Sequence, residues 1–276
     1  MNYAQARKRR RIVAATTTKD ALTSTPLDYP FEIWPSCFAL RDGQAERLPV
    51  TSLPLANLGD FRSIVAKLEA SGLDSHHGAF DIPNPIGLFS CGSNASPLRM
   101  AEKLRSSSSS VALGIRVSTP CYVPCYGATL SYYGSVPATF AARSGSAFPF
   151  LIITDAANLD AMVESETRTG NYDLHRSTVS NAAIGCDMPV YAFLCRFGPL
   201  LLDGEIRRLS EFQADPDLGV SQRTLIGDLL GRLGYDLTPD RFAEQVRDKA
   251  LWAELRGRII DSFASCPDLE GFERLG

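Results

Sequence analysis

The stretch TDAANLDAMVESETRTGNY, residues 154–172, is the segment around which the rest of the chain can be interpreted. Thr154 is a residue type that caps helix N-termini. The apolar residues Leu159, Met162 and Val163 recur at helical spacing. The sequence therefore predicts a short amphipathic helix with one buried face. The next residue on that face is Glu166, at seven positions after Leu159.

A carboxylate at this position is unusual for two physical reasons. It points toward the apolar side of the predicted helix, and it lies near the helix C-terminus, where the macrodipole disfavours negative charge by about 0.3–1 kcal/mol. Both effects make Glu166 a stronger proton acceptor than an exposed glutamate. Glu166 is therefore predicted to be a general base that works near neutral pH. The alternative is a helix-end residue that turns outward, as Glu164 is expected to do.

The composition is that of an ordinary globular protein, with 276 residues, 45% hydrophobic and 21% charged. A net charge of −3 gives no general reason to expect nucleic acid or an anionic membrane as a partner. Seven cysteines without regular spacing indicate reduced thiols. No apolar run reaches the roughly 18 residues of a membrane span, and no signal peptide is recognisable, so we expect a cytoplasmic protein.

The sequence predicts a chain of four segments. They are a flexible basic arm (1–25), an N-terminal extension with one helix (26–83), a main domain of short strands and helices (84–214), and a C-terminal helical extension (215–276). The helix of the N-terminal extension is expected over 57–72, and those of the C-terminal extension over 221–234 and 238–264. The basic run Arg7–Arg11 favours a solvated tail, because five charges alone bind nucleic acid weakly.

A glycine turn far upstream of Glu166 is the second candidate element. Residues 86–91 are a short apolar strand that leads into a Gly-Ser-Asn turn at 92–94, and Ser96-Pro97 begins a helix that runs to about Arg105. A strand, a turn and a helix start place several backbone N–H groups side by side, and such donors bind a carboxylate or a polarised carbonyl. Taken alone, such a turn favours a purely structural role.

The central part of the chain is predicted to be rich in short strands. Residues 111–153 contain several apolar segments separated by glycines, which is typical of an antiparallel or mixed sheet that curls. Further strands are expected over 172–179 and 189–197. A hairpin is expected at Asp203-Gly204.

The sequence does not predict a metal site. Cys121 and Cys125 are four apart in an extended segment, and without a second cysteine pair they are interpreted as small strand residues. His76 and His77 precede a strand without nearby acidic or cysteine ligands, so they are interpreted as loop residues.

Four motifs, in this order, resemble those of the gamma-glutamylcyclotransferase-like family. They are FSCGSN at 89–94, GSVPAT at 134–139, NLDAMVESE at 158–166 and GNYDLHR at 170–176. They are similar to that family's F-x-Y-G-S-N turn, its G-x-x-A-T strand, its L-x-x-L-D-x-x-E helix with a catalytic final glutamate, and its G-x-Y-x-R strand. The resemblance covers about residues 86–210.

The resemblance implies both a fold and a reaction. The fold would be α+β, a small mixed or antiparallel β-barrel with packed helices. The enzyme, a transferase or lyase, would release 5-oxoproline from a small gamma-glutamyl amide: the substrate's own α-amine attacks its side-chain carbonyl, and an amine leaves. Glu166 would be the general acid and base, and no metal or organic cofactor is expected. The substrate-binding residues would be Cys91, Gly92, Ser93, Asn94 and Tyr172.

The chain departs from the family pattern at three positions. Cys91 stands where the family usually has tyrosine, Val163 where it usually has aspartate, and Thr167 where it commonly has glycine. The choice of substrate is therefore expected to differ. The alternative function is a non-catalytic binding or regulatory protein on the same fold, which meets a partner through its helices or basic arm. A third hypothesis makes Cys91 a nucleophile, which requires a histidine within reach.

Overall fold

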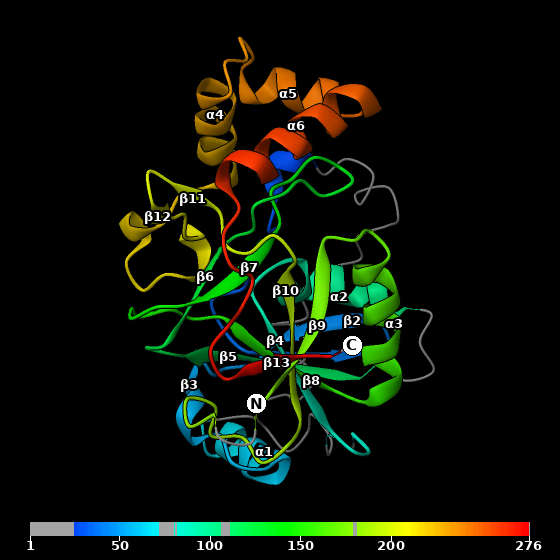
Figure 1. The fold of residues 1–276 in the computed structure, drawn as a ribbon. Helices are drawn as coiled ribbons and strands as arrows, with labels where there is room; N and C mark the ends of the chain where they lie inside the picture. The colour runs from blue at the N-terminus through cyan, green and yellow to red at the C-terminus, as the bar shows by residue number, and fades with distance from the viewer. Residues whose placement is uncertain (1–24, 72–79, 81, 106–110, 179–180, 276) are drawn as a thin grey trace, which may run out of the picture.

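The computed structural model describes residues 25–71, 80, 82–105, 111–178 and 181–275. Within these residues the architecture is α+β, as predicted, with a mixed nine-stranded sheet and six α-helices (Figure 1). None of the described helices combines the length and the apolar character needed to cross a membrane. The predicted basic arm and the His76-His77 pair lie outside the described residues.

The main sheet has the strand order β13-β9-β10-β4-β8-β5-β1-β2, and β3 pairs with β5 off this path. The strands are β1 Phe38–Arg41, β2 Gln44–Arg47, β3 Leu53–Pro54, β4 Ile86–Ser90, β5 Ala112–Ser118, β8 Phe150–Thr154, β9 Tyr172–Ser177, β10 Val190–Cys195 and β13 Phe272–Arg274. The β10–β4 and β3–β5 pairs are parallel, and the other pairs are antiparallel.

No closed barrel is found among the described residues, so the predicted barrel is not confirmed. A barrel requires its two edge strands to pair. In the described part of the chain, β13 and β2 are the edges and do not pair with each other. β2 is largely exposed and carries polar and charged side chains, which is typical of a strand that ends a sheet.

The N-terminal segment contributes strands to the main sheet. Phe38 of β1 lies opposite Gly114 of β5 in the strand register. A Cβ at Gly114 would overlap the Phe38 ring, so the glycine provides the space that the ring fills. The sheet thus takes strands from the predicted N-terminal extension, from the main domain and, through β13, from the C-terminal extension.

The helices lie in three places (Figure 1). Their bounds are α1 Phe61–Ala70, α2 Pro97–Leu104, α3 Ala156–Thr167, α4 Gln222–Arg232, α5 Pro239–Gln245 and α6 Lys249–Phe263. α1 lies at one end of the molecule, α4, α5 and α6 lie together at the other end, and α2 and α3 lie beside the sheet.

Two helix predictions need correction. α3 is capped by Asp155, whose side chain accepts a hydrogen bond from the backbone N–H of Asn158, while Thr154 ends strand β8. The single helix predicted over 238–264 is two helices. Asp248 caps the second of them, because its side chain accepts from the backbone N–H of Ala250 and so begins a new helix there.

Two short ribbons complete the fold. β11 Leu201–Leu202 and β12 Glu205–Ile206 form the hairpin predicted at Asp203-Gly204, where both turn residues have positive φ angles of 57° and 78°. β6 Tyr122–Tyr126 and β7 Ala138–Ala142 pair with each other outside the main sheet.

Candidate functional site

Glu166 lies in the last turn of α3, where its side chain is 15% exposed. The buried face predicted for this helix is confirmed, since Leu159 and Met162 are buried. The carboxylate is not left uncompensated on this face, however. It forms an ion pair with the Lys103 ammonium group of α2, and that lysine is itself only 23% exposed.

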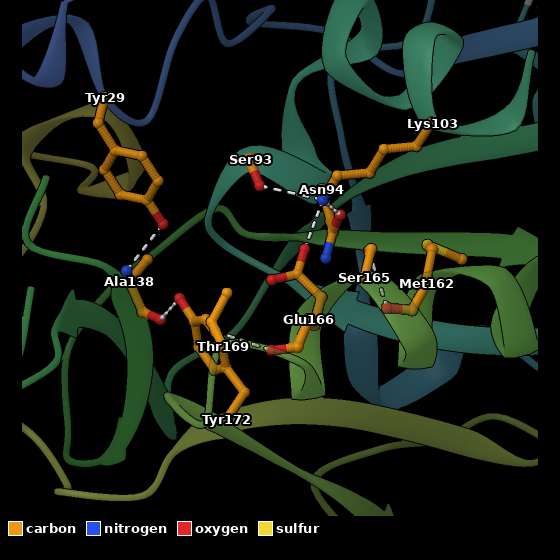
Figure 2. A network of polar contacts seen from close by, with 10 residues as sticks. All are labelled: Tyr29, Ser93, Asn94, Lys103, Ala138, Met162, Ser165, Glu166, Thr169 and Tyr172. Carbon is orange, nitrogen blue, oxygen red and sulfur yellow. Dashed lines mark hydrogen bonds and ion pairs between the residues drawn. The ribbon is translucent and has the colours of Figure 1, made fainter. Parts of the chain in front are cut away.

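Lys103 connects Glu166 to the predicted glycine turn. Its Nζ donates to the side-chain oxygen of Asn94 at 2.6 Å and to the Ser93 hydroxyl at 3.3 Å. Figure 2 shows the lysine side chain reaching from α2 to this group of oxygens. Three of the predicted site residues, the adjacent pair Ser93 and Asn94 and the distant Glu166, therefore share one cation.

The turn before α2 joins the strand and the helix between which the sequence predicts it. Ser93–Ala95 form a single 3-10 turn between β4 and α2. α2 begins at Pro97, as predicted, although the Ser96 hydroxyl makes no capping hydrogen bond. Within the described residues, the structure pairs no acceptor with the backbone N–H groups of residues 92–94. These donors can therefore bind an anion without giving up another hydrogen bond.

The peptide of Ala138, in β7, links two tyrosines to the site. Its N–H donates to the Tyr29 hydroxyl at 2.8 Å, and its carbonyl accepts from the Tyr172 hydroxyl at 3.0 Å (Figure 2). Tyr29 comes from the N-terminal segment and Tyr172 from the first position of β9. The Tyr172 hydroxyl proton is thus already donated to the backbone.

The negative charge of Glu166 acts on three tyrosines, whose hydroxyl groups stay protonated. Burial is the main cause that raises the pKa values of Tyr29 and Tyr172 above their ordinary value. Desolvation also raises the pKa of Tyr133, although 43% of this residue is exposed. The negative charge of Glu166 raises all three pKa values further, which shows that it lies within electrostatic range of each ring. The site therefore offers neutral hydroxyl groups within electrostatic range of one carboxylate.

Cys91, the residue before the turn, is buried. It is 4% exposed, and its thiol donates to the carbonyl oxygen of Thr139 at 3.2 Å. Burial raises the pKa of this thiol well above its ordinary value, so the thiolate needed for nucleophilic attack is scarce. The contacts of Cys91 are those of a buried structural residue.

Helix α6 supports the loop that carries Tyr133. The indole N–H of Trp252 donates to the carbonyl of Ser131 at 2.7 Å. Arg256, one turn later, donates to the side-chain oxygen of Asn171, the residue before Tyr172, at 3.2 Å. The C-terminal extension is thereby attached to both chain segments next to the candidate site.

Sequence reasoning missed two residues of this network, Lys103 and Tyr29. A signal for Lys103 was present, because it follows Ser96 by two helical turns and side chains of a helix lean toward its N-terminus. No local pattern points to Tyr29, since it lies 109 residues from Ala138. The spacing of the four motifs indicates neither Lys103 nor Tyr29.

Comparisons with known proteins gave no match: no family model, no curated protein and no solved structure is significantly similar to this chain. Within the described residues, no group of three or more histidine, cysteine, aspartate or glutamate side chains is arranged to hold a metal ion.

Proposed function

We propose that the protein is a gamma-glutamylcyclotransferase-like enzyme that cyclises a gamma-glutamyl amide to 5-oxoproline and releases an amine or amino acid. The observation that carries the proposal is the Lys103 network, in which one ammonium group contacts Glu166, Asn94 and Ser93. It brings the predicted base and the predicted anion-binding turn to the same place. The open sheet does not have the barrel form that the resemblance implied, so the proposal depends on the site.

The reaction needs few groups from the protein, because the nucleophile belongs to the substrate. The substrate's α-ammonium group must lose a proton, its amine must attack the γ-carbonyl, and the leaving amine must gain a proton. Glu166 would accept the first proton and return it to the leaving group. The N–H groups of residues 92–94 would stabilise the oxyanion that forms on the carbonyl oxygen.

Orientation would supply much of the rate. Well-placed intramolecular reactions reach effective molarities of about 10⁵–10⁸ M. Tyr29 and Tyr172 hold the Ala138 peptide between them, so the wall beside Glu166 is fixed before a substrate binds. In this scheme the Tyr172 hydroxyl can accept, but not donate, a hydrogen bond to the substrate.

Lys103 gives the proposal a specific requirement. Its ammonium group occupies the position next to Glu166 that the substrate's α-ammonium group would take. The Lys103 ammonium group and the substrate's α-ammonium group would bind the same carboxylate. The substrate must therefore displace the lysine from Glu166. The flexible lysine side chain can swing away while it keeps Asn94 as a partner.

The same ion pair favours a second candidate function, a non-catalytic binding or regulatory protein on this fold. A carboxylate that is already neutralised by Lys103 does not need a catalytic role to be tolerated below the surface. In this case Glu166 and Lys103 would simply hold α3 against α2.

Incubation with a panel of gamma-glutamyl amino acids and amines, followed by mass spectrometry for 5-oxoproline, separates the two functions. The enzyme is expected to release 5-oxoproline from at least one compound. General acid–base catalysis contributes about 10²–10⁴-fold, so Glu166→Gln should lower the rate by about 100-fold or more. The glutamine can still accept from Lys103, so the variant should fold. Glu164→Gln, at an exposed position of the same helix, is the matched control and should keep full activity. Absence of 5-oxoproline from every compound would contradict the proposal.

A further inference from the structure

A second polar cluster lies on the other face of β9 from the Tyr172 side chain. Successive strand residues point to opposite faces, so Asp173 and His175 face away from Tyr172. Arg274 of β13 stands opposite His175 in the strand register, and Arg196 follows the end of β10. Together with Cys195, Pro267 and Asp268, these residues line a cavity of about 240 Å³.

The two arginines are held in place by one largely buried carboxylate. The Asp173 side chain is 12% exposed and accepts from Arg196 Nε at 2.8 Å and from an Arg274 terminal nitrogen at 2.9 Å. Each guanidinium group has five N–H donors and uses one nitrogen in this contact. Their remaining donors can bind an oxyanion in the fork geometry that arginine provides.

His175 supplies a buried polar atom without a partner. The residue is 5% exposed, and its Nδ1 has no hydrogen-bond partner within the described residues. Burial lowers the pKa of this imidazole, so its neutral form, with one donor and one acceptor nitrogen, is favoured. An unpaired buried polar atom costs about 1–3 kcal/mol, so the cavity wall at His175 is polar and incompletely hydrogen-bonded within the described residues.

The charges around the cavity select the kind of ligand. Besides the two guanidinium groups there is a second carboxylate, Asp268, which is exposed and accepts a weak hydrogen bond from the Cys266 thiol at 3.3 Å. A ligand with only negative charge would be repelled by this carboxylate. A ligand with only positive charge would be repelled by Arg196 and Arg274. A zwitterion can satisfy both. A volume of about 240 Å³ lies below the roughly 300–1,000 Å³ of pockets for drug-sized ligands, so the cavity suits a smaller molecule.

We propose that this cavity is a binding site for a free α-amino acid, whose carboxylate lies between Arg196 and Arg274 and whose ammonium group faces Asp268. His175 contacts the ligand from the buried side. The site is separate from Glu166, and the proposal does not depend on the reaction proposed above.

The test is a titration of the full chain, labelled with ¹⁵N-histidine and followed by NMR. The imidazole signals of His175 are assigned with the variant His175→Gln. The zwitterionic probes are glycine, L-alanine, L-glutamine and L-glutamate; acetate and inorganic phosphate are the anionic probes, and methylammonium is the cationic one. At constant ionic strength, at least one amino acid should shift the His175 signals saturably, with a Kd at least tenfold lower than that of any singly charged probe.

Two variants show where the amino acid binds. Arg274→Gln should raise its Kd at least tenfold. Arg176→Gln, an exposed position next to His175 whose side chain leaves from the opposite face of β9, should leave the Kd unchanged. Arg196→Gln gives a second measurement if Arg274→Gln lowers the melting temperature. Glu166→Gln should keep normal binding, which separates this site from the proposed catalytic one.

Three results would overturn the proposal. The first is that no amino acid shifts the His175 signals. The second is that acetate or phosphate binds as tightly as the best amino acid, which would make the cavity a simple anion site. The third is that folded arginine variants bind as tightly as the wild type.

Discussion

The hydroxyl group of Tyr29 lies against Gly92 and leaves no room there for a side chain. A Cβ at residue 92 would overlap the Tyr29 hydroxyl oxygen, and the same oxygen accepts the hydrogen bond from the Ala138 N–H at 2.8 Å. One hydroxyl group from the N-terminal segment thus joins the glycine turn to β7. This contact determines how closely the two walls of the candidate site approach.

The first prediction is that changes at Gly92 and Tyr29 are coupled. Gly92→Ala should lower the free energy of unfolding by about 1–3 kcal/mol through overpacking. Tyr29→Phe should lower it by about 1–3 kcal/mol, because the Ala138 N–H loses its acceptor. In the double variant the clashing hydroxyl is absent, and the ring carbon that carried it is 3.5 Å from the added Cβ, which is an ordinary contact. The double variant should therefore lose less stability than the sum of the two single losses. Urea unfolding of all four proteins measures this difference, and strict additivity would contradict the contact.

The second prediction concerns the Lys103–Glu166 pair. Lys103→Met leaves the Glu166 carboxylate and the Asn94 oxygen without their shared donor, so it should lower the free energy of unfolding by about 1–3 kcal/mol. In the Glu166→Gln background the same change should cost less, because an unpaired amide is easier to tolerate than an unpaired carboxylate.

An exposed ion pair serves as the control for this cycle. Arg241 and Glu244, on α5, are 70% and 64% exposed, and exposed pairs contribute about 0–1 kcal/mol. Arg241→Gln should therefore change the free energy of unfolding far less than Lys103→Met. Equal effects of the two substitutions would show that the Lys103 pair is no stronger than a surface contact.

The third prediction is a pH dependence of stability that comes from His175. Burial lowers the pKa of this imidazole in the folded state below its ordinary value of 6.5. The unfolded chain therefore binds a proton at a higher pH than the folded chain does. The stability contributed by the neutral imidazole is complete above about pH 6.5 and is lost as the pH falls through the folded-state pKa.

Urea unfolding at pH 7.5 and pH 5 checks this sign. The wild type should lose more stability than His175→Gln over this interval, since glutamine does not titrate. A variant that loses as much stability as the wild type would assign the pH dependence to other groups.

The fourth prediction concerns the cysteines. Cys121 and Cys266 are exposed, whereas Cys91 is buried and its thiol pKa is raised by that burial. Because the thiolate is the reactive form, iodoacetamide at pH 8 should label the two exposed cysteines well before Cys91. Peptide mass spectrometry over a time course gives the order. Fast and selective labelling of Cys91 would contradict this prediction and support the hypothesis that Cys91 is a nucleophile.

Much of the local structure follows from the sequence alone. The apolar spacing around Leu159 predicts α3, the Asp203-Gly204 pair predicts its hairpin, and Pro97 predicts the start of α2; the structure has all three. These features depend on hydrogen bonds and side chains within a few residues of one another. The inward position of Glu166 belongs to the same group, because helical periodicity alone places it on the buried face.

Only the tertiary structure decides the partners of these elements. Lys103 meets Glu166 across 63 residues, and Tyr29 meets Ala138 across 109. The open sheet, its N-terminal strands and the His175 cavity likewise depend on which strands become neighbours. Local patterns fix which side of an element is buried, but many elements can bury that side against one another. The choice among them is made by the packing of the whole core, which no short stretch of sequence contains.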